Sequence, residues 1–102
     1  MKRGIFNRYV EYVCREMNVT REQLFRKNRS AKFSTARFLL YALCYQRPMT
    51  IVQIVDLMAE NGYEIACAGV RHGIVKIKKT DDPDANEFIN KGLEECSLEE
   101  VL

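Results

Sequence analysis

Apolar residues in the first part of the chain recur at helical spacing. Tyr9, Val13 and Met17 fall on one face, with charged residues between them. This pattern is typical of an amphipathic helix and predicts one over residues 5–17.

Two capping-box patterns mark further helix starts. In each, a threonine precedes a glutamine by three residues: Thr20 with Gln23, and Thr50 with Gln53. The two side chains of a box satisfy each other's free backbone donors at the start of a helix. The first box predicts a short helix through Phe25. The second predicts a longer one, because apolar residues follow it at helical spacing.

Between these helices, a basic segment precedes a strongly apolar one. Residues 26–33 hold four Lys or Arg and almost nothing apolar before Phe33, which is typical of a loop. Residues 38–45 are apolar nearly all round and predict a central, buried helix. Ser34 or Thr35 is expected to cap it, and Pro48 to end it, because proline disfavours helical geometry in the preceding residue.

After the second capping box, the pattern predicts a helix, a turn and another helix. Residues 61–62 (Asn-Gly) are a stop signal, since glycine readily adopts the left-handed conformation that closes a helix. Val70, Ile74 and Ile77 share one face of the next helix. Residues 75–78 also alternate between apolar and polar, so a short strand there is an alternative to the helix.

The C-terminal part is expected to be helical but interrupted. Residues 81–84 resemble a linker, and residues 85–91 predict a short helix with Gly92 as its stop. Ser97 is placed to cap one last turn.

These patterns predict an all-α fold, a small bundle of about five to six helices. Residues 50–79 have the layout of a helix-turn-helix, a motif whose second helix lies in the major groove of DNA. Residues 1–80 are expected to form the helix-turn-helix domain, and residues 81–102 an acidic, helical C-terminal tail.

Composition adds the class of protein. The chain has 102 residues, 47% hydrophobic and 29% charged, which fits one globular domain and not a disordered segment. No apolar run approaches the ~18 residues of a membrane span, and no apolar signal core follows the basic N-terminus. We expect no membrane association and a cytoplasmic location, nucleoid-associated if the protein is bound to DNA.

The four cysteines indicate reduced thiols and no metal. Cys14, Cys44, Cys67 and Cys96 are widely spaced, without the short-spaced pairs of zinc sites. The first three lie among apolar residues and are expected to act as small core side chains. We expect no cofactor.

Charge is distributed unevenly along the chain. Residues 1–47 carry 11 Lys/Arg and 3 Asp/Glu, whereas residues 80–102 carry 1 and 8. This asymmetry predicts a basic surface for a polyanion and an acidic tail. The tail could fold back over the basic surface, dock a partner, or only solvate a terminal helix.

Catalytic chemistry is not expected. His72 is the only histidine, so a triad or a histidine metal site lacks partners. A structural or surface role, or a DNA contact, fits His72 better. We therefore expect no enzyme activity and no small-molecule substrate.

Four stretches together resemble the C-terminal DNA-binding domain of DnaA, the bacterial replication initiator. Residues 19–30 (VTREQLFRKNRS) match its second helix and basic loop, and residues 34–43 (STARFLLYAL) its buried helix. Residues 53–56 (QIVD) and 70–77 (VRHGIVKI) match the two helices of its motif. The resemblance covers about residues 9–77. It implies that Arg29 enters the minor groove, with Lys27 as its basic neighbour and Arg37 beside the DNA backbone.

The chain departs from this family where base readout begins. The family starts its recognition helix with Asp-His-Thr-Thr, whereas residues 66–69 here read Ala-Cys-Ala-Gly. None of these side chains makes the usual major-groove hydrogen bonds. The turn is about four residues longer, and the phosphate-binding loop of the family's ATPase domain is absent. We therefore expect weak or altered sequence specificity.

The leading interpretation is double-stranded DNA binding, in an accessory or regulatory role in replication or transcription. An alternative is a protein-interaction module whose basic face meets an acidic protein, and RNA binding is a further possibility. The predicted DNA contacts are Arg26, Lys27, Arg29, Lys32, Arg37, Arg71, His72 and Lys76.

Overall fold

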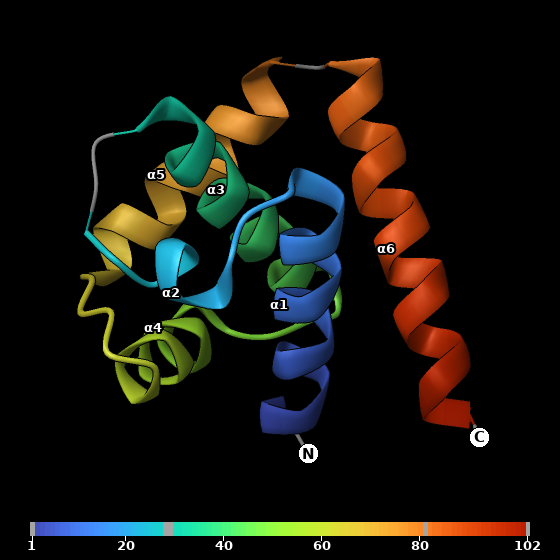
Figure 1. Cartoon of the computed structure of the whole chain (residues 1–102), viewed down its shortest axis with the longest axis horizontal. Helices are drawn as coiled ribbons and strands as arrows, with labels where there is room; N and C mark the ends of the chain where they lie inside the picture. The colour runs from blue at the N-terminus through green and yellow to red at the C-terminus, as the bar shows by residue number, and fades with distance from the viewer. Residues whose placement is uncertain (1, 28–29, 81, 102) are drawn as a thin grey trace.

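The computed structural model is all-α (Figure 1). It describes the backbone of residues 2–27, 30–80 and 82–101, and the side chains of residues 3–27, 30–79 and 82–96. The described backbone forms six α-helices and no strand. They are α1 (Lys2–Met17), α2 (Arg21–Leu24), α3 (Ala31–Gln46), α4 (Ile51–Glu60), α5 (Cys67–Thr80) and α6 (Pro83–Val101).

Helix α3 lies at the centre and contacts all five other helices. Its sequence explains this place, because apolar side chains surround it on nearly every side. Leu40, Leu43 and Cys44 are fully buried. The predicted central helix is confirmed.

Both predicted capping boxes are present. The Thr20 hydroxyl accepts from the Gln23 backbone N–H at 3.0 Å, and the Gln23 carboxamide oxygen accepts from the Thr20 N–H at 2.9 Å. The Thr50 and Gln53 pair repeats this arrangement at 3.1 and 2.9 Å. These bonds start α2 and α4 where the sequence predicts.

Two predicted helix starts are wrong. Helix α1 begins at Lys2 and not at residue 5. Helix α3 begins at Ala31, so Ser34 and Thr35 lie inside it, and the N-cap residue, Ser30, makes no side-chain capping bond. Helix α3 includes the half-buried Phe33, which packs against the core. Tertiary packing, and not a polar cap, therefore determines where α3 begins.

The segment from α4 to α5 has the predicted helix, turn and helix. Helix α4 ends at Glu60, and Gly62 adopts a left-handed backbone with φ of +84°. Helix α5 follows after residue 66, and residues 75–78 are helical, so the alternative of a strand is excluded. Val70, Ile74 and Ile77 are buried together on one side of α5, as their spacing predicts.

Helix α6 is longer than predicted. The Asp82 carboxylate accepts from the Asp84 N–H at 3.0 Å, and the helix begins at Pro83. It then continues through Gly92, so the predicted stop there is wrong. A Cβ at Gly92 would lie 2.6 Å from Cε2 of Tyr12. Gly92 thus lets α6 approach α1. The predicted linker, residues 81–84, is also wrong in part, because residues 83–84 already belong to α6; residue 81 lies outside the described part.

The cysteines follow the prediction only in part. All four are free; Cys44 is buried and Cys14 half-buried, but Cys67 is exposed at the first turn of α5. Cys67 is therefore not a core residue, because it lies in the exposed first turn of α5, before that helix reaches the core at Val70. Cys96, on α6, is buried. Burial raises the pKa of the Cys44 thiol, which keeps it neutral.

Candidate nucleic-acid interface

The start of the basic segment, just after α2, lies against the turn between α4 and α5. Arg26 and Lys27 are exposed there. The Lys27 ammonium lies 5.4 Å from the ring centroid of Tyr63, a half-buried residue of the turn. This contact places the basic segment beside the entrance to α5, as the colours of Figure 1 also show.

Arg37 holds this arrangement from inside. It is only 4% exposed, and its guanidinium donates to the backbone oxygens of Leu24 and Arg26 at 3.1 and 3.2 Å. The same guanidinium lies 5.0 Å from the Tyr63 ring centroid. Arg37 is therefore not part of the exposed candidate interface, because its guanidinium binds backbone carbonyls at the end of α2.

A second arginine that sequence reasoning missed supports the same region. One nitrogen of Arg21 donates to the amide oxygens of Asn7 and Asn61, both at 2.9 Å. Asn61 in turn donates to the Leu57 carbonyl at 2.8 Å. Arg21 thus ties α1 and α2 to the end of α4. No local pattern reveals such a bond between residues 40 positions apart.

The other predicted contacts of the basic segment differ in their surroundings. Arg26 is paired with Glu22 across one helical turn. Lys32 lies in the first turn of α3, is exposed, and donates to the Asn18 carbonyl at 3.3 Å. Arg29 lies outside the described residues. The structure thus places Lys27 nearest the α4–α5 turn and Lys32 nearer to the end of α1.

The exposed side of α5 brings together the remaining predicted contacts. Arg71, His72 and Lys76 are all exposed. His72 meets the Phe38 ring edge-on at 6.1 Å between centroids. The Lys76 ammonium lies 5.8 Å from the centroid of the same ring. Phe38 of α3 therefore supports the base of two of these side chains.

Two further lysines extend this surface. Lys78 and Lys79 are exposed near the end of α5, and α5 contains no Asp or Glu. The Lys78 ammonium lies 5.5 Å from the ring of Tyr45, which is itself 41% exposed. Neither lysine is among the DNA contacts predicted from the sequence. Their common exposure with Lys76 makes them part of the candidate interface.

The start of α5 offers little polar chemistry. Residues 66–68 are exposed, but their side chains are methyl groups and one thiol. A Cβ at Gly69 would lie 2.8 Å from Cγ1 of Ile65. Gly69 therefore permits the turn to close on α5, and this part of the helix cannot supply bidentate hydrogen bonds to bases.

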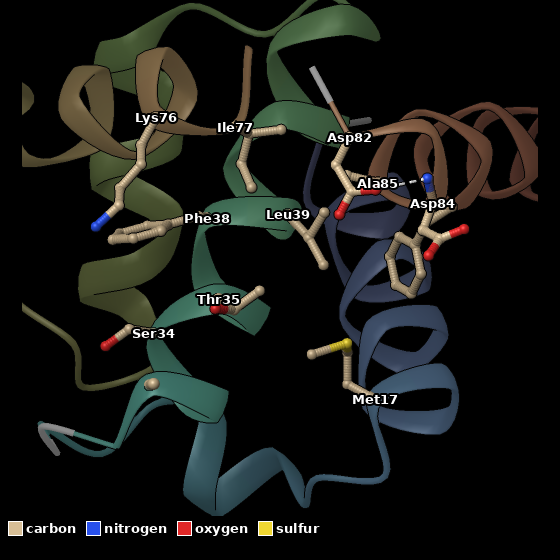
Figure 2. A pocket seen from close by; sticks show the side chains of 12 residues that line it. Met17, Ser34, Thr35, Phe38, Leu39, Lys76, Ile77, Asp82, Asp84 and Ala85 are labelled. Atoms are coloured by element: carbon tan, nitrogen blue, oxygen red, sulfur yellow. Dashed lines mark hydrogen bonds between the residues drawn. The ribbon is translucent and has the colours of Figure 1, made fainter. Parts of the chain in front are cut away.

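A hollow of about 410 Å³ lies behind α5, between α3 and the start of α6 (Figure 2). Its lining is mostly apolar and includes Phe38, Leu39 and Ile77. Figure 2 shows the Asp82 carboxylate at its rim, joined to the Asp84 N–H that it caps. The acidic side chains here serve the start of α6, and the hollow does not include His72.

The described residues contain no group of three potential metal ligands. Among the helices that the structure describes, none is long and apolar enough to cross a membrane. No family model matches the chain, and comparison with curated proteins and with solved structures gave no match either. Function therefore has to be inferred from the side chains of the chain itself.

Proposed function

We propose that the protein binds double-stranded DNA through residues 26–32 and the exposed face of α5, with α4 and α5 acting as a helix-turn-helix. The resemblance of residues 9–77 to the C-terminal domain of DnaA supports this proposal. So does the order of α4, turn and α5 (Figure 1). The proposed role is accessory or regulatory, in replication or transcription, and does not involve catalysis.

One observation carries the proposal: Lys27, from one cationic segment without acidic residues, contacts the turn that leads into a second such segment, α5. Residues 26–32 and α5 contain no Asp or Glu. Tyr63, which leads into α5, is in contact with Lys27. Lys and Arg bind DNA by displacing condensed counterions from phosphates, so affinity grows with the number of cations that face one duplex.

We also propose that sequence preference is weak or differs from that of DnaA. Residues 66–69 lack polar side chains that could read base edges. Arg71 is the first residue along α5 that can bond a guanine through two nitrogens, a contact worth about 1–3 kcal/mol of discrimination. A competition between duplexes with and without the DnaA box tests this proposal, and a strong preference for the box would contradict it.

Affinity for a duplex of mixed sequence, measured against salt concentration, tests the proposal itself. If about four phosphates are neutralised, the logarithm of affinity should fall with the logarithm of salt at a slope of roughly −3.6. Lys76→Gln should reduce the magnitude of that slope by about 0.9, because one phosphate contact is lost. Lys27→Gln should act in the same direction.

Lys91→Gln is the matched control, since Lys91 is an exposed lysine on α6. It removes the same charge from another face and should leave affinity unchanged. Equal losses in Lys76→Gln and Lys91→Gln would reject the proposed surface. So would the absence of duplex binding at low salt.

Arg29 is proposed as the minor-groove contact on the resemblance alone. The double variant Lys27→Ala/Arg29→Ala should weaken binding to most duplexes, and by more than Lys27→Ala alone. Equal affinity of the single and double variants would remove Arg29 from the interface.

A further inference from the structure

An apolar side chain lies exposed within the cationic face of α5. Val75 is 41% exposed, one of three large hydrophobic residues that the described part of the chain leaves so open. It lines a shallow hollow of about 290 Å³ together with His72, Lys76 and Lys79. The apolar surface is thus surrounded by groups suited to a polyanion.

The helical register makes Val75 the middle of this exposed face. Ala68, His72 and Lys79 precede or follow it by seven, three and four residues, and all are exposed. Residues at such spacing lie on one side of a helix. The opposite side is buried through Val70 and Ile74. Any surface that meets the exposed side of α5 therefore meets Val75.

Val75 contributes little to the fold. Its side chain is far more exposed than those of its neighbours Ile74 and Ile77, which are 5% and 9% exposed. A β-branched residue is also a weaker helix former than alanine or lysine. Neither packing nor helix propensity thus requires a valine here, and its exposed methyl groups are free to contact an apolar group of a partner.

We propose that Val75 is a specificity-determining residue that contacts the C5 methyl group of thymine in the major groove. This inference rests on the proposed DNA binding. The thymine methyl is the apolar group that a base pair presents in this groove, beside the O4 acceptor. The cations around Val75 fit the flanking phosphates, and Arg71, one turn before it, is placed for the neighbouring base pair.

Uracil substitution tests this contact, because deoxyuridine differs from thymidine only by the missing methyl. A preferred duplex is first selected from a random pool with the wild-type protein. Each thymine is then replaced singly by uracil, and affinity is measured by fluorescence anisotropy. At one position the loss should be about fourfold, since a buried methyl-sized group contributes ~0.8 kcal/mol and about 1.4 kcal/mol is tenfold.

Val75→Ala should bind the thymine and uracil duplexes equally at that position. Val52→Ala is the matched control, because Val52 is 59% exposed but lies on α4. It should keep the full uracil effect. Circular dichroism and the melting temperature of each variant show whether it is folded.

The outcomes separate the two proposals. Binding that no uracil substitution weakens would overturn the thymine contact and leave DNA binding intact. A uracil effect that persists in Val75→Ala would overturn the assignment to Val75. Failure of the wild-type protein to bind any duplex at low salt would overturn the proposed function, and this inference with it.

Discussion

Helices α5 and α6 pack in the same way but expose opposite charges. Each lies against α3 and brings a glycine close to an aromatic ring. A Cβ on Gly73 would lie 2.6 Å from Cδ1 of Phe38, and one on Gly92 2.6 Å from Cε2 of Tyr12. Yet α5 carries four Lys/Arg and no Asp/Glu, whereas α6 carries one Lys and six Asp/Glu.

The comparison separates what holds a helix in place from what it offers to a partner. On the buried side of each helix, a glycine stands where the helix comes closest to an aromatic ring. The exposed sides can then vary in charge without disturbing the packing. Figure 1 shows α6 along α1, on the other side of α1 from α2, so the acidic helix does not cover the start of the basic segment.

Filling the glycine contacts should break this shared packing, with the largest effect at Gly92. Gly92→Ala should destabilise the protein by about 1–3 kcal/mol, the usual cost of overpacking. Tyr12 cannot yield easily, because its hydroxyl donates to the Phe88 carbonyl at 2.7 Å. Gly73→Ala should cost less, since the half-buried Phe38 ring can turn outward. Urea unfolding measures both.

Gly4→Ala is the control for these two variants. It also lies in a helix, but nothing comes within 4 Å of an added Cβ. Alanine should leave stability unchanged or raise it by up to about 1 kcal/mol, because glycine is a poor helix residue. If the Gly92→Ala and Gly4→Ala proteins had the same free energy of unfolding, α6 would not pack closely against Tyr12 at Gly92.

Local signals predicted the helices well. The capping boxes at Thr20 and Thr50 involve residues three positions apart, so both partners are visible in the sequence. The apolar spacing of Val70, Ile74 and Ile77 likewise identified the buried side of α5. The all-α fold and the central place of α3 follow from such patterns.

Features that depend on distant residues could not be predicted. Gly92 resembles a helix stop until Tyr12 is placed against it. Arg37 resembles a phosphate ligand until the carbonyls of residues 24 and 26 are seen around its guanidinium. In the candidate interface, Lys27, Lys32 and Lys76 were therefore predicted from the sequence. Lys78 and Lys79 were not, and neither were the positioning roles of Arg21 and Arg37.

The two tyrosines beneath these glycines should respond differently to loss of their hydroxyl groups. Tyr12 spans from α1 to α6 through its bond to Phe88. Tyr41, whose Cδ2 would lie 3.0 Å from a Cβ on Gly73, is buried, and its hydroxyl has no hydrogen-bond partner among the described residues. Tyr12→Phe should cost about 0.5–1.5 kcal/mol, the net value of a typical hydrogen bond. Tyr41→Phe should be neutral or slightly stabilising, as urea unfolding at pH 7 can show.

Alkaline pH tests the burial of Tyr12 separately. Burial, with the nearby carboxylates of Glu16 and Glu95, raises the pKa of Tyr12 to about 12. An unfolded tyrosine titrates near pH ~10. A raised folded pKa means that the stabilisation is complete below the unfolded pKa and is lost between about pH 10 and 12. Tyr12→Phe should therefore lose less stability than the wild type over this range, and an unchanged slope would contradict the assignment.

The smallest expected effect concerns the ion pair at the rim between α1 and α6. Arg15 donates to Glu95 at 2.7 Å, with both side chains substantially exposed, and its guanidinium lies 5.5 Å from the Tyr12 ring. Because water and salt screen exposed charges, this pair should contribute less than the Tyr12 hydroxyl. A double-mutant cycle of Arg15→Gln and Glu95→Gln, read from melting temperatures, should give a small favourable coupling at low salt that disappears at about 1 M salt. A coupling that survives high salt would instead show that α6 is held by charge as well as by Gly92. The buried contacts of α6 would then no longer be enough to explain its position.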